Sequence, residues 1–413
     1  MSLLNRSNLK ELPTNLWIAS ATSFLTDISS EMVINILPLF LSAVLGVKTN
    51  IIGVIEGIAE ATSSLLKVFS GWLSDKLRTR KWLAVVGYGL SALAKPFFYV
   101  ANSWGSVAGV RWADRVGKGI RTAPRDALVA DNVKPEQRGL AFGLHRAADT
   151  AGALLGILIA AFIVWRLQAG SAVLAEQTFR TVVLISLIPA FLAVIVLAIG
   201  TKEVKVEGEV RKVRISFKGL GRNFIVFLVI VGIFDLGNSS DAFLVLRAQE
   251  RGMSALNILI MLAAFNLIYA LISTPAGALS DKLGRRKLII GGWIVYALIY
   301  LGFALAQSAV QIWLLYAAYG MYYGLAYGTA KAMVADLVPT EMRGTAFGTY
   351  NAILGILDFP ASVIAGLLWS GVGGWKGFGP SAPFFFGAGM AILAVILFML
   401  WKPTPLPVEQ PNA

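Results

Sequence analysis

The 413-residue sequence contains no cysteine and one histidine, His145. These absences exclude a disulfide framework, a thiolate metal site and a polyhistidine site within one chain. Only 14% of the residues are charged, against roughly a quarter in soluble domains, while 57% are hydrophobic and the mean hydropathy is +0.71. The composition therefore excludes an ordinary soluble enzyme and a disordered chain. With no nucleotide-binding glycine loop and no nucleophile cluster either, we expect no enzymatic activity and no cofactor.

Long apolar runs divide the chain into twelve candidate membrane spans, since a spanning helix needs about 20 mostly apolar residues. The fourth span is the weakest by hydropathy, and its alternative interpretation is a soluble loop. The sequence predicts an all-α membrane protein with spans near residues 14–44, 50–73, 82–101, 105–130, 139–165, 178–200, 222–246, 254–279, 288–307, 310–336, 344–371 and 383–402.

Basic residues follow the loops unevenly. Of the 36 Lys and Arg residues, about 21 lie at the termini and in the loops on their side, and about 6 lie in the opposite loops, which by the positive-inside rule predicts cytoplasmic termini. The net charge of +13 is thus explained by topology, and we expect a bilayer rather than nucleic acid as the partner. The expected location is the cell (inner) membrane.

The two halves of the sequence repeat each other. Gly71-Trp-Leu-Ser-Asp75-Lys76 matches Gly277-Ala-Leu-Ser-Asp281-Lys282, 206 residues later. A second block, from Val129 to Gly143, matches Val334 to Gly348 at an offset of 205, which indicates duplication. We predict two six-helix bundles, 1–200 and 222–413, joined by a charged cytoplasmic linker, 201–221.

With this repeat and its loop motif, the sequence resembles the major facilitator superfamily. The motif G-x-x-x-D-[RK]-x-G-[RK]-[RK] is matched in the second half, whereas in the first half Arg78 replaces a glycine. The resemblance implies a cytoplasmic gate in which Asp75 faces the start of the eleventh span and Asp281 the start of the fifth. The alternative is that the basic residues only anchor the loops. The gate residues implied are Gly71, Asp75, Lys76, Arg80, Asp131, Arg138, Gly277, Asp281, Lys282, Arg285, Arg286, Asp336 and Arg343.

Charges inside the spans concentrate in the first half. The fourth span carries them at helical spacing, so one stripe must face water or paired carboxylates. Arg115 and Gly119 also match the family motif R-x-x-Q-G-x-G, although Lys118 and Arg121 depart from it. Seven acids and seven bases in these spans leave a sum near zero. The predicted solute and proton pathway contains Asp27, Glu31, Glu56, Glu60, Arg111, Asp114, Arg115, Lys118, Arg121, Arg125, Asp126, His145, Arg146 and Asp149.

The second half is more apolar and aromatic. We add to the predicted pathway Asp235, Asp241, Tyr323, Tyr327 and Asp358. The tyrosines either contact a solute or only pack helices. Asp27, Glu31 and Asp149 are the candidates for proton coupling, because breaking an ion pair changes a carboxylate's proton affinity; His145 is either a coupling group or a plain hydrogen-bonding residue.

The sequence therefore predicts a secondary active transporter that works as a monomer. We expect a proton-coupled exporter of a small polar or charged solute. A proton symporter or facilitator that imports an organic anion is the alternative. A membrane sensor or enzyme lacks any supporting motif.

Overall fold

A computed structural model describes residues 12–134, 137–168, 171, 173–203, 219–339 and 342–402, without the side chains of residues 138–139, 273–283, 325–328 and 344. Apart from one isolated bridge between Val372 and Trp375, the regular structure in this described part is helical, which confirms the predicted fold class.

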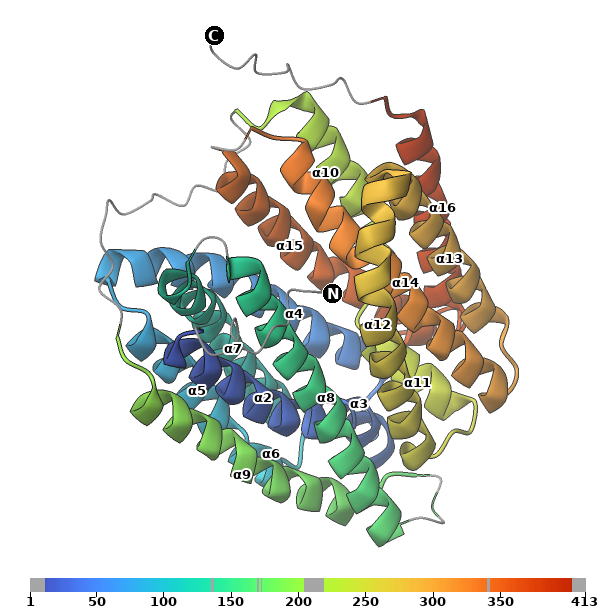
Figure 1. Cartoon of the computed structure of the whole chain (residues 1–413). Helices are drawn as coiled ribbons and strands as arrows, with labels where there is room; N and C mark the ends of the chain where they lie inside the picture. Colours follow the sequence, from blue (N-terminus) through green and yellow to red (C-terminus); the bar gives the residue numbers. More distant parts are fainter. Residues whose placement is uncertain are drawn as a thin grey trace.

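The helices follow the twelve predicted segments, with ends that differ by a few residues (Figure 1). In chain order they are α2 (Thr14–Ile34) with α3 (Leu37–Leu39) and the π-helix η1 (Phe40–Val44), α4 (Thr49–Leu77), α5 (Lys81–Ala94) with α6 (Pro96–Val100), α7 (Trp104–Asn132), α8 (Arg138–Gln168), α9 (Glu176–Gly200), α10 (Gly221–Leu236) with α11 (Ala242–Glu250), α12 (Ala255–Leu283), α13 (Arg285–Leu305), α14 (Ala309–Asp336), α15 (Arg343–Ser370) and α16 (Ala382–Leu400).

Eight of these segments in the described chain are long and apolar enough to cross a membrane. The remaining segments are α4, α7, α10 with α11, and α14. Helix α7 nevertheless runs unbroken for 29 residues and packs against α4 and α5, so the fourth span is a bundle helix and not a loop. At 1.5 Å per residue its length is about 43 Å, more than enough for a bilayer.

The duplication is visible where α7 and α14 begin. Ser103 and Ser106 form a capping box at the start of α7, and Ser308 and Gln311 form one at the start of α14. The two caps are 205 residues apart, which is the offset of the second sequence block. The equivalent helices α7 and α14 therefore start in the same way.

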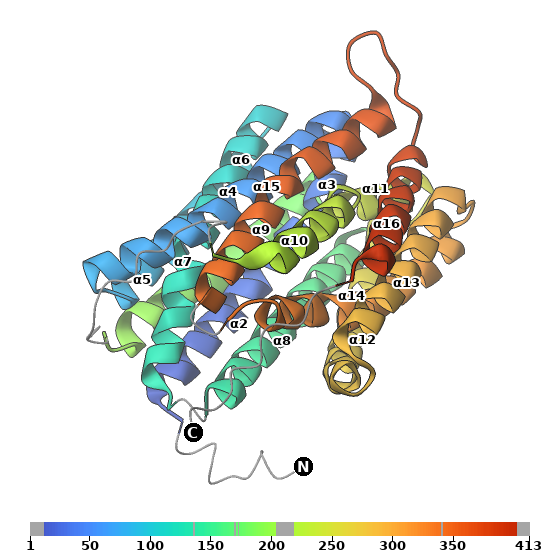
Figure 2. The ribbon, with the colours of Figure 1, turned by 90° about the horizontal axis from the view of Figure 1, so that it is seen from above.

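The first six segments gather on one side of the molecule and the last six on the other (Figure 1). We call these the N-half and the C-half. Within the N-half α2 packs against α8 and α9, and within the C-half α13 packs against α14 and α16. The halves meet through α4 against α15 and α8 against α12; Figure 2 shows α4 beside α15.

Small residues let α4 and α15 approach closely. A Cβ at Gly53 would lie 2.4 Å from the carbonyl oxygen of Ser362, and a Cβ at Gly355 would lie 2.0 Å from Cβ of Ser64. We call the side where α2 begins and α16 ends the terminal side. Near the opposite side, the backbone N–H of Asn50 donates to Ser370 Oγ (2.9 Å) and its side chain to the carbonyl oxygen of Gly371 (2.8 Å). These contacts hold the halves together at that side.

The seventh predicted span is interrupted, a feature that the sequence analysis did not predict. Helix α10 ends at Leu236 and α11 begins at Ala242. The break spans Gly237 to Asp241. Its first four residues, Gly237, Asn238, Ser239 and Ser240, are weak helix formers, the last three because their side chains compete for backbone hydrogen bonds. Irregular backbone at membrane depth is tolerated where it is buried or lines a cavity.

The turn after α4 contains Arg78, which replaces the glycine of the loop motif. This residue adopts the left-handed conformation (φ 51°) that ends the helix, and Gly284 in the second copy also has a positive φ of 87°. Both copies therefore place a residue with positive φ after the helix, but the turns differ: Arg78 is left-handed helical with ψ 34°, whereas Gly284 has ψ 134°. Arg78 adopts its conformation despite having a side chain.

Candidate transport cavity and its charge network

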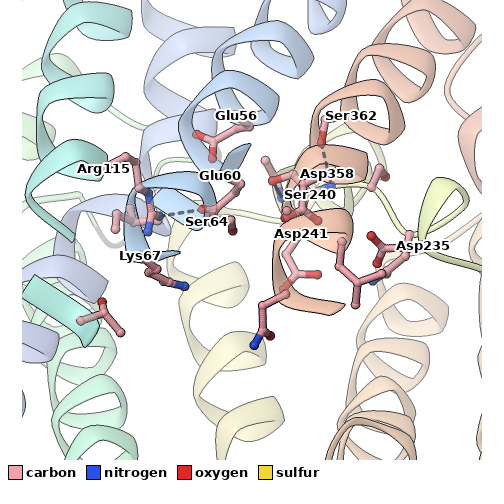
Figure 3. Close-up of a pocket in the computed structure, with 18 of the residues that line it drawn as sticks. Glu56, Glu60, Ser64, Lys67, Arg115, Asp235, Ser240, Asp241, Asp358 and Ser362 are labelled. Atoms are coloured by element: carbon pink, nitrogen blue, oxygen red, sulfur yellow. Dashed lines mark hydrogen bonds and ion pairs between the residues drawn. The ribbon is translucent and has the colours of Figure 1, made fainter. Parts of the chain in front are cut away.

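A cavity of about 880 Å³ lies between the halves and is lined from both of them. In Figure 3, Glu60, Lys67 and Arg115 lie on the N-half side, opposite Asp235, Asp241 and Asp358. The predicted pathway residues that line it are Glu31, Glu56, Glu60, Arg111, Arg115, Asp126, Asp235, Asp241, Tyr323 and Asp358. The break between α10 and α11 also contributes Asn238, Ser239 and Ser240.

Ion pairs of Arg111 and Arg115 with Glu56 and Glu60 join α7 to α4. Arg111 binds both carboxylate oxygens of Glu56, through Nη2 at 2.7 Å and Nε at 3.2 Å. One turn further on, Arg115 Nη2 lies 3.0 Å from Glu60 Oε1. Both pairs follow i, i+4 spacing on each helix, so α4 supplies one carboxylate for each arginine.

A second group of polar contacts joins α7 to α5. Ser91 on α5 donates to Asp114 Oδ1 (2.8 Å) and accepts from Arg121 Nη1 (2.8 Å). The Arg121 guanidinium also lies over the ring of Tyr88 at 4.6 Å. These residues lie outside the cavity lining, so this part of the stripe packs within the N-half.

Lys95 is a further buried charge of the N-half, and the sequence analysis missed it. It is buried between α5 and α6, and its Nζ donates to Ser29 Oγ at 2.6 Å and to Ser30 Oγ at 3.1 Å. The predicted balance of seven acids and seven bases is therefore wrong by one base. The sequence feature that could have identified Lys95 is a single lysine before a proline inside an apolar run.

Helices α2, α7 and α8 meet around His145. Its ring lies 3.3 Å from Ser20 Oγ and 3.4 Å from Ser23 Oγ, and Asp149 lies 3.7 Å from Nε2. Arg125 donates to Ser23 Oγ (2.9 Å) and pairs with Asp126 (2.8 Å). His145 thus has hydrogen-bond partners and a carboxylate beside it, and it does not line the cavity.

Asp27 also lies beside the cavity and not in its lining. It is half-buried on α2, one turn before Glu31, which does line the cavity. Asp149, Lys118 and Arg121 lie within electrostatic reach of Asp27. Arg146 is exposed on α8 and donates to Tyr269 of α12 at 3.2 Å, between the halves.

The C-half wall carries carboxylates of a different kind. Asp235 is 8% exposed, and its Oδ2 is buried without a hydrogen-bond partner. Asp241 accepts a hydrogen bond from Tyr319 (3.2 Å). Within the described chain, Asp235, Asp241 and Asp358 form no ion pair within 4.0 Å.

Aromatic rings stand beside these carboxylates. Phe265, Tyr316 and Tyr323 line the cavity, and the Phe265 ring contacts both tyrosine rings edge-on, with ring centres 5.3 and 5.5 Å apart. Tyr319 is buried among the rings and does not line the cavity. The side chain of Tyr327 lies outside the described residues.

The predicted gate residues are paired within each half. Arg80 pairs with Asp75 and, at 3.1 Å, with Asp131, while Arg285 lies 2.7 Å from Asp336. In this arrangement Asp75 pairs with Arg80 of its own half, and that Asp75 faces the start of α15 stays a prediction.

The other gate residues take separate positions. Gly71 lines the cavity, and Lys76 lies over the Trp72 ring (5.0 Å). Arg286 donates to the carbonyl oxygens of Phe398 (2.8 Å) and Met399 (3.0 Å) at the end of α16. Arg343 donates to the carbonyl oxygen of Ala335 (3.3 Å). The side chains of Arg138, Asp281 and Lys282, and the surroundings of Gly277, lie outside what the structure describes.

A charged cavity at membrane depth, shared by two similar helical halves, defines the class of membrane carriers. The family model described as Major Facilitator Superfamily matches residues 19–357 and 225–413. An uncharacterized MFS-type transporter of Methanocaldococcus jannaschii is 37% identical over 401 residues, which covers 96% of each chain. The chain therefore belongs to the major facilitator superfamily and is a multi-pass membrane transporter, not an enzyme.

Two further comparisons are more distant. The quinolone resistance protein NorA of Staphylococcus aureus is 26% identical over 175 residues, or 42% of each chain. The crystal structure of a bacterial homologue of the human lysosomal transporter Spinster, inward-facing and occupied, has a TM-score of 0.75 at 14% identity, covering 94% of this chain and 98% of that one. The latter likeness concerns the fold alone.

Proposed function

We propose that the protein is a proton-coupled exporter that carries a small polar or charged solute by alternating access. In this proposal the bundles 1–200 and 222–413 rock against each other about the 201–221 linker. The terminal side faces the cytoplasm of a cell (inner) membrane, in line with the loop charges.

The observation that carries the proposal is the cavity shared by the two halves. Near the opposite side the halves are joined by Asn50 with Ser370, and by Ser42, which donates to Gln249 at 2.8 Å. Toward the terminal side the cavity lining extends to Gly71 on α4 and Gly348 on α15. The two halves are thus joined on one side of the cavity, and the cavity lining extends toward the proposed cytoplasmic side. This arrangement suits the step in which an exporter takes up its solute.

The proton pathway in this proposal lies in the N-half. Asp27 lies one helical turn from Glu31, which lines the cavity, and Asp149 lies within electrostatic reach of Asp27. A conformational change that moves α2 against α7 or α8 alters the charges around Asp27, and hence its proton affinity. The partial similarity to a quinolone resistance protein also favours export.

The gate in this proposal closes on the terminal side. Asp75 leaves Arg80 and meets the start of α15, where the helix dipole is positive. The Arg80–Asp131 and Arg285–Asp336 pairs then hold the loops of each half in place.

Flux in proteoliposomes tests the proposal. Vesicles that hold the protein and a pH-sensitive dye are given an imposed pH gradient, and candidate organic cations, anions and zwitterions are added in turn. We expect at least one solute class to drive proton movement in the opposite direction to its own. Asp27→Asn is expected to abolish that coupling, whereas Glu176→Gln, a carboxylate exposed at the start of α9, serves as the matched control. Solute flux that ignores the pH gradient would overturn proton coupling.

A further inference from the structure

The charges of the cavity wall are unequal between the two halves. Among the described residues, seven acidic and four basic side chains line the cavity. On the N-half side, Arg111 and Arg115 are neutralised by Glu56 and Glu60. On the C-half wall, three carboxylates (Asp235, Asp241 and Asp358) line the cavity together with one base among the described residues, Lys331, so acidic groups are in excess there.

The lack of a hydrogen-bond partner at Oδ2 of Asp235 favours a ligand-binding role for the C-half carboxylates over a purely structural one. A buried carboxylate oxygen without a hydrogen-bond partner is costly, and native proteins keep few of them. The arginine nitrogens on the N-half wall that also lack a hydrogen-bond partner belong to Arg111 and Arg115, but each of these side chains already has a carboxylate within 4 Å. Asp235 has no basic group within that distance in the described chain, so an ionised Asp235 has no counter-ion there.

The surroundings favour an organic cation over a bare metal ion. The cavity of about 880 Å³ has the size of a site for a small organic molecule. Phe265, Tyr316 and Tyr323 line it next to the carboxylates, and aromatic faces attract organic cations while they pack against an apolar body. The described residues also hold no cluster of acidic or histidine side chains arranged for a metal ion.

We propose that the C-half wall, formed by Asp235, Asp241, Asp358 and the rings of Phe265, Tyr316 and Tyr323, binds the positively charged nitrogen of an organic cation. The cation supplies the counter-ion that Asp235 and Asp358 lack, and its apolar body lies against the rings. This inference rests on the proposed transport function and adds the class of solute.

Three probes of matched length test the charge requirement: (4-phenylbutyl)trimethylammonium, 4-phenylbutanol and 4-phenylbutyrate. Binding to the full-length protein in detergent is measured by titration calorimetry at low ionic strength. We expect the cation to bind at least tenfold more tightly than the alcohol or the carboxylate. Equal affinity for the three, or preference for 4-phenylbutyrate, would overturn the inference and favour an anionic solute.

Substitutions locate the site. Asp235→Asn and Asp358→Asn are expected to weaken binding of the cation at least tenfold, Asp235→Glu to retain it within a few fold, and Glu176→Gln to leave it unchanged. Size-exclusion profiles and thermal unfolding check that each variant is folded. Unchanged affinity in both folded Asn variants contradicts the inference. Because this titration needs no proton gradient, its failure is distinct from a failure of proton-coupled flux in vesicles.

Discussion

The two walls of the cavity differ in whether their buried charged side chains have ion-pair partners. On the N-half wall each cavity-lining arginine has a carboxylate partner one helix away, as in Arg111 with Glu56. On the C-half wall Asp235 keeps an oxygen without a hydrogen-bond partner, in a cavity that Tyr316 and Tyr323 also line. Breaking a buried ion pair costs free energy of folding, whereas a buried charge without a partner already destabilises the folded protein. The difference suggests that the N-half network preserves the fold and the coupling, and that the C-half carboxylates await a ligand.

The largest expected effect comes from breaking a pair on the N-half wall. Arg111→Leu leaves Glu56 as an uncompensated buried charge, which costs roughly 3–5 kcal/mol. We expect the midpoint of thermal unfolding in detergent to fall by on the order of 10 °C, with most of the loss recovered in the double variant Glu56→Leu/Arg111→Leu.

Asp235→Asn is the matched comparison for that variant on the other wall. Because it removes a charge that has no partner, its unfolding midpoint is expected to stay level or rise. The contrast between the walls fails if Asp235→Asn destabilises the protein as much as Arg111→Leu does.

An intermediate effect is expected where the halves touch. Gly53→Ala places a Cβ 2.4 Å from the Ser362 carbonyl oxygen, so α4 and α15 must separate. Spin labels at Lys48→Cys and Val372→Cys, on the opposite side of the two halves, are expected to show a larger share of long distances. The natural chain has no cysteine, so labels attach only at the chosen sites.

Gly89→Ala is the control for this experiment, because a Cβ at Gly89 meets open space. An identical distance distribution in Gly53→Ala and Gly89→Ala would show that the α4–α15 contact does not hold the opposite side shut.

The smallest effect compares the two copies of the turn after α4 and α12. Arg78→Gly removes the side chain that strains a left-handed residue and is expected to stabilise the protein by up to about 1 kcal/mol. Gly284→Ala, at φ 87°, is expected to destabilise it by a similar amount. Thermal unfolding measures both, and a lower midpoint for Arg78→Gly would mean that the arginine side chain contributes a contact that outweighs the strain.

Most of the fold could be predicted from the sequence, because apolar runs of membrane length are a local property. The even number of spans and the repeat identified α7 despite its charges. The break at Gly237–Asp241 was missed because the flanking apolar residues continue on both sides of it, although four weak helix formers in succession marked its place.

The sequence predicted which charged residues cluster in the N-half, but not which of them form ion pairs. Helical spacing placed Arg111 and Arg115 on one face, but which carboxylates they bind depends on how α4 packs beside α7. Lys95 was missed because it lies apart from the charged stripe in sequence. The sequence also gave no means to tell a paired carboxylate from Asp235, since that difference arises only where the two halves meet.

The most direct test of this division of roles measures binding and coupling in the same two variants. With (4-phenylbutyl)trimethylammonium as the probe, Asp27→Asn is expected to bind the cation with wild-type affinity and to exchange it across vesicles, yet to lose accumulation driven by a pH gradient. Asp235→Asn is expected to lose binding, exchange and accumulation together. If Asp27→Asn weakens binding as much as Asp235→Asn does, or if Asp235→Asn still binds and accumulates the cation, the two walls do not have separate roles.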